Sequence, residues 1–381
     1  PAAQPSGSEA PNLTVTKFLM YNALGEPADV VESPAGGTEH VRKTIATYDA
    51  AGRQLIKKLE GGGTAIPKTE TVYSPTLGLP ERQQLACESN CASYSSSFGT
   101  SGTGELKRPL GIAVDASGNV YVAAKELNCV KKFSSGGTYL GAIGKCGTAG
   151  SGNGEFKEPR SVAIDPSGHI WVVDTGNLRV EEFTAGGAYI QSLGGGHLSM
   201  PYELAVDGEG RVWVADQSGK IVEYKETSPG VYPFYGEVTS VEGAKVEPEG
   251  ISVDAAGDLW IAEGNANRIT EFELTSAGYV FHHVFGTAGS GSGQFSNPFD
   301  VVAGRWGELL VVDAGNDSIQ QYSLHGNYMG SFGAEGTGAG HLIEPASIAL
   351  GPGGAISVTD RGNHRVEKWQ ASSGAEATTT T

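Results

Sequence analysis

The sequence predicts an all-β protein whose main domain is a six-bladed β-propeller. Six prolines recur at intervals of 42 to 50 residues, at Pro109, Pro159, Pro201, Pro248, Pro298 and Pro345. Intervals of this length are typical of propellers, in which each repeat forms one blade. The chain of 381 residues also contains 57 glycines but only 26 lysines and arginines, which favours short strands joined by tight turns over helices.

Each repeat has room for four strands, which is the content of a propeller blade. A first, apolar strand follows every proline, and six residues after the proline stands Asp115, Asp165, Asp207, Asp254, Gly304 or Gly351. A second strand follows a glycine turn, at 120–122, 170–173, 212–214, 259–261, 309–312 and 356–358. A third strand ends on an aromatic residue, at Phe133, Phe183, Tyr224, Phe272, Tyr322 and Trp369. A fourth strand contains Tyr139, Tyr189, Tyr232, Tyr279 and Tyr328. Their alternation and aromatic content predict strands.

A short motif between the second and third strands resembles a known family. It is clearest in Asp174-Thr-Gly-Asn-Leu-Arg-Val, Glu263-Gly-Asn-Ala-Asn-Arg-Ile and Asp360-Arg-Gly-Asn-His-Arg-Val. These segments resemble the NHL repeat, and the resemblance implies a propeller. The first, third and fifth units depart from the motif because they lack its arginine.

The two ends of the predicted propeller complement each other. The sixth unit stops after Trp369 without a fourth strand, whereas residues 93–99, ahead of the first unit, look like such a strand. We expect this N-terminal strand to pair into the last blade and close the ring, because closure removes an edge that would invite aggregation. The propeller is therefore expected to span residues 93–370, after a linker at 87–92 and before a disordered tail at 371–381.

Residues 1–86 are expected to form a small β-hairpin segment of a different kind. Tyr48-Asp-Ala-Ala-Gly-Arg resembles the YD repeat of Rhs-type and teneurin-like shells, with weaker echoes starting at Tyr21 and Tyr73. The spacings of 27 and 25 residues suit a repeated hairpin. The alternative is a set of unrelated β-hairpins. The resemblance implies a larger bacterial polypeptide, whose remainder would be the natural partner of this segment.

The four cysteines are expected to form two local disulfides. In a four-stranded blade the third strand starts on the face where the fourth ends, which brings Cys129 close to Cys146. Cys87 and Cys91 lie four residues apart in a polar loop and are expected to pair with each other. The alternative is a set of free thiols. Two disulfides would fit an extracellular or cell-surface location.

Charge and hydropathy exclude two classes of partner. The net charge is −17, and no stripe of lysine and arginine opposes it, so we expect no nucleic acid partner. No stretch of the sequence approaches the roughly 18 apolar residues that span a bilayer, so we expect no membrane insertion.

The expected ligand site lies on the face where the first strand of each blade begins. Arg160, Tyr202, Glu249 and Phe299 each directly follow a blade proline, and Glu203 and Asp300 lie next to them. The acids of the repeated motif are expected to bond to backbone groups within their turns. Glu203, Glu249 and Asp300 do not follow the repeat, so they are the better binding candidates. Carboxylates beside aromatics predict a cationic, peptide or carbohydrate ligand.

Catalytic motifs are not evident in the sequence. The NHL resemblance extends to an amidating lyase, which depends on several histidines around a metal ion in the channel. Only His197, His341 and His364 would reach the ligand face, and of these His341 and His364 are the weak alternative for a metal site. We therefore expect no cofactor and a non-catalytic extracellular recognition or scaffold propeller of a Rhs-like toxin or adhesion polypeptide. The alternative is a metal-dependent lyase or hydrolase acting at the channel mouth.

Overall fold

The structure is a computed structural model that describes residues 92–371, apart from 242–243, 276–277 and 305–306, together with backbone strands between residues 20 and 86. The chain divides into two compact units, with the boundary before Ala92. The predicted tail at 371–381 lies outside the described residues except for Ala371, as does the linker at 87–92 except for Ala92.

The N-terminal unit contains one antiparallel sheet of six strands in chain order. Its strands are β1 (Met20–Tyr21), β2 (Pro27–Glu32), β3 (Arg42–Tyr48), β4 (Gln54–Gly61), β5 (Lys68–Tyr73) and β6 (Pro80–Ala86). Strands β1, β3 and β5 end on Tyr21, Tyr48 and Tyr73, and the pairing with the next strand shifts register at each of these tyrosines. The three segments singled out in the sequence therefore follow one backbone pattern.

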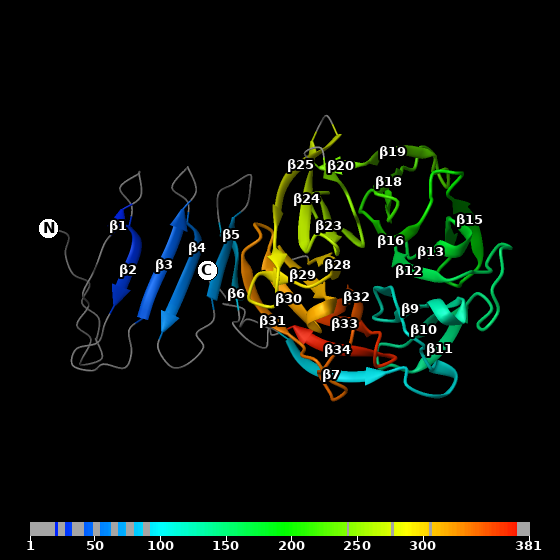
Figure 1. Cartoon of the computed structure of the whole chain (residues 1–381), viewed down its shortest axis with the longest axis horizontal. Coiled ribbons are helices and arrows are strands. Elements are labelled where there is room, and N and C mark those ends of the chain that lie inside the picture. Colours follow the sequence, from blue (N-terminus) through cyan, green and yellow to red (C-terminus); the bar gives the residue numbers. More distant parts are fainter. Residues whose placement is uncertain are drawn as a thin grey trace. The chain divides into compact units, whose positions relative to one another are not determined.

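The second unit is a propeller of six four-stranded antiparallel blades (Figure 1). Blade 1 comprises β8 (Ile112–Val114), β9 (Val120–Ala124), β10 (Cys129–Phe133) and β11 (Tyr139–Ile143). Blade 2 comprises β12 (Pro159–Ile164), β13 (Ile170–Asp174), β14 (Arg179–Phe183) and β15 (Tyr189–Leu193). Blade 3 comprises β16 (Pro201–Val206), β17 (Val212–Asp216), β18 (Lys220–Tyr224) and β19 (Phe234–Val238).

The remaining blades repeat this arrangement. Blade 4 comprises β22 (Gly250–Val253), β23 (Leu259–Glu263), β24 (Arg268–Thr275) and β25 (Gly278–Phe285). Blade 5 comprises β28 (Pro298–Ala303), β29 (Glu308–Asp313), β30 (Ser318–Ser323) and β31 (Tyr328–Phe332). Blade 6 comprises β32 (Pro345–Leu350), β33 (Ala355–Asp360), β34 (Arg365–Ala371) and β7 (Ala92–Phe98). Two short pairs lie between blades, β20 (Ser240–Val241) with β21 (Ala244–Lys245), and β26 (Thr287–Ala288) with β27 (Gln294–Phe295).

Helical structure among the described residues is limited to five 3-10 turns. They are η1 (Gly102–Gly104), η2 (Lys125–Leu127), η3 (Thr175–Asn177), η4 (Ala314–Asn316) and η5 (Pro352–Gly354). No helix in this part of the chain has the length and apolar character needed to cross a membrane.

The second strand of each blade is apolar on both faces because each blade packs between two neighbours. All five residues of β13 are buried. Trp171 packs into a core shared with blade 3, whereas Val172 packs into a core shared with blade 1. Strands buried on both faces form continuous apolar runs instead of alternating patterns. The core of the domain is therefore a series of layers between blades.

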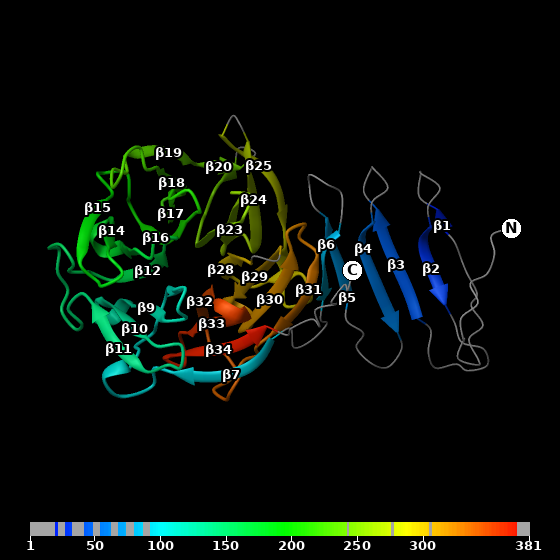
Figure 2. The same ribbon diagram turned by 180° about the vertical axis from the view of Figure 1, so that it is seen from behind.

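The ring closes through the N-terminal strand, as the sequence predicted. Strand β7 pairs antiparallel with β34, from Phe98 opposite Val366 to Ala92 opposite Ala371. In both views the cyan β7 runs beside the red β34 (Figures 1 and 2). The sixth blade thus combines the first and last strands of the domain, and the prediction of a propeller closed by an N-terminal strand is confirmed.

The acids of the repeated motif hold the blades together. Asp174 accepts hydrogen bonds from the Lys157 backbone N–H at 2.7 Å, from Asn177 Nδ2 at 2.7 Å and from Arg179 Nε at 2.8 Å. Arg179 also donates to the carbonyls of Ser151, Gly152 and Glu155 in the connection between blades 1 and 2. These buried groups are saturated by protein partners, so the motif is structural.

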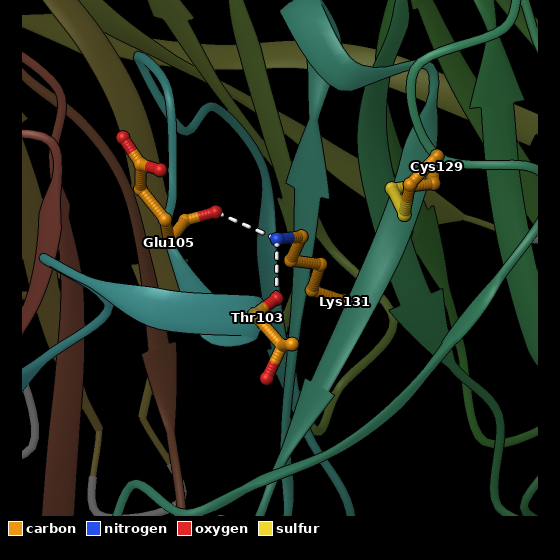
Figure 3. The surroundings of a disulfide bond; sticks show 5 residues. Thr103, Glu105, Cys129 and Lys131 are labelled. Atoms are coloured by element: carbon orange, nitrogen blue, oxygen red, sulfur yellow. Dashed lines mark hydrogen bonds between the residues drawn. A yellow bond between two sulfur atoms is a disulfide. The ribbon is translucent and has the colours of Figure 1, made fainter.

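The disulfide between Cys129 and Cys146 is present in the first blade. It joins the start of β10 to the segment that follows β11, in agreement with the predicted strand directions. Close to it, the Lys131 ammonium donates to the carbonyls of Thr103 and Glu105 at 2.8 and 2.7 Å (Figure 3). The expected partners Cys87 and Cys91 lie outside the described residues.

Removing the closing strand should destabilise the whole propeller. Deletion of residues 1–100 removes β7, and with it roughly four to six backbone hydrogen bonds at about 1 kcal/mol each. That loss is comparable with the net stability of a domain, about 5–15 kcal/mol. Deletion of residues 1–91 keeps β7 and serves as the control. Thermal melting should show a large decrease only for the longer deletion, and equal melting temperatures would contradict the role of β7.

Opening the disulfide should lower the stability of the propeller without changing its fold. Cys129 and Cys146 are 17 residues apart, and a loop of this length stabilises by about 3 kcal/mol through the unfolded state. We expect the double variant Cys129→Ser and Cys146→Ser to have a lower melting temperature, and to unfold at a lower urea concentration, than the native protein. Reducing agent should lower the melting temperature of the native protein and leave that of the variant unchanged.

Candidate functional site

Two rings of residues surround the channel where the first strands of the blades begin. The mouth ring consists of the six residues directly after the blade prolines: Leu110, Arg160, Tyr202, Glu249, Phe299 and Ala346. The throat ring consists of the next six residues: Gly111, Ser161, Glu203, Gly250, Asp300 and Ser347. One hollow is lined by the whole mouth ring and by Gly111, Glu203 and Ser347. The repeat therefore supplies the scaffold of the site, and the irregular residues supply its chemistry.

The hollow admits only a small chemical group. It measures about 220 Å³ when the space open to solvent is included, but its enclosed part has room for about one water molecule. A ligand would therefore place one small group in the hollow and keep the rest of the molecule outside it.

The structure brings five of the six predicted binding residues to this hollow. They are Arg160, Tyr202, Glu203, Glu249 and Phe299. The sixth, Asp300, is buried in the throat ring with 4% of its surface exposed and does not line the hollow. Asp300 therefore acts on the site through its neighbours.

Asp300 links blade 5 to blade 6. Its carboxylate accepts hydrogen bonds from Ser347 Oγ at 2.8 Å, from the Ile348 backbone N–H at 3.0 Å and from its neighbour, the Val301 N–H, at 2.7 Å. These donors favour the charged form, but burial outweighs them and raises the pKa of Asp300 to about 6. The group is consequently ionised at neutral pH.

Glu203 is the acid of the throat ring that lines the hollow. Burial raises its pKa well above the ordinary value, and the negative charge of Asp300 raises it further. The hydroxyl of Ser161 donates to its carboxyl group. Burial and the charge of Asp300 therefore both favour the protonated form of Glu203.

Gly250 makes room for this pair of acids. A Cβ atom at Gly250 would lie 2.6 Å from the Cα of Asp300 and 2.8 Å from its Oδ1. Gly111 faces Ser161 in the same way, since a Cβ there would lie 2.5 Å from the Cα of Ser161. Side chains at these two positions would collide with the next blade. The narrow throat thus restricts carboxylates to a few of its six positions.

The mouth ring combines aromatic, basic and acidic groups. The guanidinium carbon of Arg160 lies 3.7 Å from the centroid of the Tyr202 ring, and that of Arg361 lies 5.8 Å from the centroid of Phe299. Burial raises the pKa of Glu249, whereas Gln217 and the two guanidinium groups oppose this increase. Arg160 Nε and Glu249 Oε2 are buried without a hydrogen-bond partner in the described part of the chain. Both atoms therefore keep unused hydrogen-bonding capacity beside the hollow.

Sequence inspection did not identify Ser161, Ser347, Gly250 or Arg361 as parts of the site. The first three occupy the same position after the blade proline as Glu203 and Asp300. A comparison of this position across the six blades could therefore have identified them from the sequence. Arg361 comes from the loop between β33 and β34, and only the folded ring brings it to Phe299.

The histidines predicted as an alternative metal site do not assemble one. His341 is exposed, and its Nδ1 lies 3.1 Å from the Ala339 carbonyl. His364 is also exposed, and its Nδ1 accepts a hydrogen bond from the Arg108 N–H at 3.0 Å. Neither belongs to a group of three metal-ligating side chains within the described ranges. The throat offers carboxylates and hydroxyls, which suit hard cations such as Mg²⁺ or Ca²⁺ better than zinc.

Comparison with known families identifies the repeat. The model of the NHL repeat matches residues 156–183 and 342–369, which carry the arginine-containing motifs of blades 2 and 6. These two segments are NHL repeats. The matched ranges lie in blades 2 and 6, and the other four blades, including blade 4 with its motif arginine Arg268, lie outside them.

Solved structures share the propeller fold at low identity. A gluconolactonase from Xanthomonas campestris is 13% identical, with a TM-score of 0.53 over 81% of this chain and 97% of that protein. A protein described as a putative gluconolactonase has the same identity and TM-score over 80% of this chain and 98% of its own. Virginiamycin B lyase from Staphylococcus aureus is 16% identical, with a TM-score of 0.47 over 69% and 94% of the two chains. No curated protein matches the sequence.

The expectation of a non-catalytic recognition or scaffold propeller from a Rhs-like polypeptide is wrong. Two solved structures that share the fold are described as a gluconolactonase and a putative gluconolactonase, so propellers of this fold include enzymes. The expectation rested on the lack of histidine clusters and nucleophile motifs in the sequence. It did not take into account that carboxyl groups from different blades converge near the channel mouth.

Neutralising Glu203 should stabilise the protein at alkaline pH. The unfolded state ionises Glu203 near its ordinary pKa of 4.5, whereas the folded state holds the proton to a much higher pH. The folded state therefore binds more protons, so stability decreases as pH rises above about 4.5 towards the folded-state pKa. Glu203→Gln should remove this decrease and raise the free energy of unfolding at pH 8 above that of the native protein. Urea unfolding at pH 5 and pH 8 measures the free energy of unfolding of both proteins. If Glu203→Gln were less stable than the native protein at pH 8, the burial of a neutral acid would be contradicted.

Proposed function

We propose that this propeller is an enzyme, a hydrolase or lyase that acts by acid–base catalysis at its channel mouth. The observation that carries the proposal is the pair of throat acids from separate blades, in which Glu203 lines the hollow and the buried charge of Asp300 raises its pKa above the ordinary value. Strongly shifted pKa values in a concave site are typical of catalytic groups. The likeness in fold to two gluconolactonases supports the proposal.

Two carboxyl groups with different surroundings face the hollow. Glu203 lies deep beside Asp300 and is the proposed general acid. Glu249 lies in the mouth ring under the influence of Arg160 and Arg361, which favour its charged form, and is the proposed general base. Hydrolysis and elimination both require one proton to be removed and another to be delivered to the leaving group. Asp300 is a positioning residue that maintains the protonated state of Glu203.

Arg160 is the proposed stabiliser of negative charge. Its Nε is buried and unpaired, and its guanidinium is held against Tyr202. A fixed cation in a dehydrated site stabilises an oxyanion as it develops. Tyr202 and Phe299 add flat apolar surfaces to the same hollow. Together these groups favour a small, hydroxylated ester or lactone of carbohydrate character as the substrate.

Activity assays on such substrates test the proposal. Glu203→Gln and Glu249→Gln should each lower kcat/KM for a responsive lactone or ester by about 10²- to 10⁴-fold, the usual contribution of a general acid or base. Glu223→Gln is the matched control, because Glu223 is a buried acid of blade 3 outside the hollow. It should retain full activity.

The same assay separates proton transfer from metal assistance. If EDTA abolishes activity and a divalent cation restores it, the reaction depends on a metal ion, and the proposed mechanism with Glu203 as general acid and Glu249 as general base is wrong. If Glu203→Gln and Glu249→Gln both keep native activity, the site itself is wrong. A panel on which the native protein shows no hydrolysis or elimination would oppose the enzymatic function.

Two further proposals concern the setting of the enzyme. We propose that it works in an oxidising, extracellular or cell-surface environment, which the Cys129–Cys146 disulfide supports. We also propose that residues 1–86 form a YD-repeat-like segment of a longer polypeptide. The shared register shifts at Tyr21, Tyr48 and Tyr73 support that proposal.

A further inference from the structure

A β-bulge on the outer edge of blade 4 places two neighbouring histidines on one side of a strand. Successive residues of a regular strand point to opposite faces. Here Glu271 pairs with His283 and Phe272 pairs with Phe281, so His282 is an extra residue in β25. An extra residue re-aims the side chains beside it. Both imidazoles therefore reach Glu271, which faces them from β24.

Three ligand atoms converge at this bulge. His282 Nδ1 lies 2.8 Å from Glu271 Oε2, and His283 Nδ1 contacts the same oxygen. The two Nδ1 atoms are 3.4 Å apart. Glu271 is buried, and no lysine or arginine forms an ion pair with it in the described part of the chain. A buried carboxylate facing two imidazole nitrogens is a typical donor set for zinc.

We propose that Glu271, His282 and His283 form a binding site for Zn²⁺ or a similar borderline divalent cation. The site is separate from the channel mouth, because β24 and β25 are the two outer strands of their blade. With metal–nitrogen bonds of about 2.0–2.1 Å, two nitrogens of a tetrahedral site are about 3.3–3.4 Å apart. The Nδ1–Nδ1 separation of 3.4 Å matches that edge. To reach the same spacing, the carboxylate oxygen has to move away by about half an ångström from the His282 nitrogen and by about 1 Å from the His283 nitrogen.

The surroundings restrict the two imidazoles differently. His283 packs edge-on against Trp260 and stacks on Phe285, with ring centroids 5.8 and 6.0 Å apart, so its ring is held in place. The side chain of His282 is 53% exposed, which leaves an open path for the cation and a position for a water ligand. Three protein ligands plus water complete a four-coordinate zinc site.

The bulge alone does not indicate a metal site, because every other blade has one too. The same register shift occurs between the third and fourth strands of every blade. The extra residues elsewhere are Leu140, Ile190, Tyr235, Met329 and Ser95. Only in blade 4 are two histidines placed opposite a glutamate. All six blades share the bulge, whereas the set of metal ligands is found in blade 4.

Blade 2 provides a matched comparison. Asp165, His169 and Glu182 also lie close together, but this group offers a single imidazole. Its carboxylates already accept hydrogen bonds, Asp165 from the Trp171 indole at 3.2 Å and Glu182 from Gln191 at 2.6 Å. A cation there would have to displace these donors. His169 is therefore the control histidine for the proposed site.

Isothermal titration of the full chain with Zn²⁺, after removal of metals, tests the proposal. We expect the native protein to bind one equivalent, and His282→Ala and Glu271→Gln to weaken the affinity at least about tenfold. His169→Ala and Glu203→Gln should bind like the native protein. Because the cation binds the folded state, zinc should also raise the melting temperature of the native protein and of His169→Ala, but not that of His282→Ala.

Three outcomes would overturn the assignment. One is native affinity in His282→Ala or in Glu271→Gln. Another is loss of binding in His169→Ala, which would move the site to blade 2. The third is a native protein that takes up no zinc in the titration and gains no thermal stability from it. Circular dichroism of each variant, recorded without metal, shows whether folding is preserved.

Discussion

The pairing of β7 with β34 is the constraint on which the rest of the structure depends. Each blade buries both faces against its neighbours, so an open ring would expose the faces of two blades and the edge of one sheet. Because β7 is the first strand of the propeller and β34 is the last, their pairing holds the two ends of the propeller domain together. It also sets the position of blade 6 next to blade 1, where the carbonyl of Leu110 accepts a hydrogen bond from Thr359 Oγ1.

Closure makes the channel narrow, and the narrow channel determines the chemistry of the site. Six equivalent positions converge in the throat, and there is no space for six large side chains. Gly111 and Gly250 approach the backbone of the next blade, while the serines support the acids. Two carboxyl groups remain; burial raises the pKa of both, and the charge of Asp300 raises that of Glu203 further. The perturbed acids therefore follow from the geometry of a small ring with an irregular sequence.

Acidic residues serve two different purposes in this propeller. Those of the repeated motif, such as Asp174 and Asp360, bind backbone N–H groups, an asparagine and an arginine, and join neighbouring blades. Those that depart from the repeat, such as Glu203 and Glu249, face the hollow. The bulge histidines of blade 4 follow the same rule, since a position common to all blades carries an exceptional residue there. In a repeat protein, departures from the consensus at equivalent positions are the residues to examine for function.

The sequence by itself determined the repeat, the strand order and the closure of the ring, because these follow from local periodicity and from counting strands. It also located Arg160, Tyr202, Glu203, Glu249 and Phe299 near one face, since each directly follows the start of a first strand. It did not determine the difference between Glu203 and Asp300, because burial depends on packing between blades that are about 100 residues apart in sequence. Nor did it indicate that His282 and His283 share a face, because alternation along a strand predicts the opposite. Only the tertiary structure decided these points, since a register shift and the convergence of separate blades are properties of the folded ring.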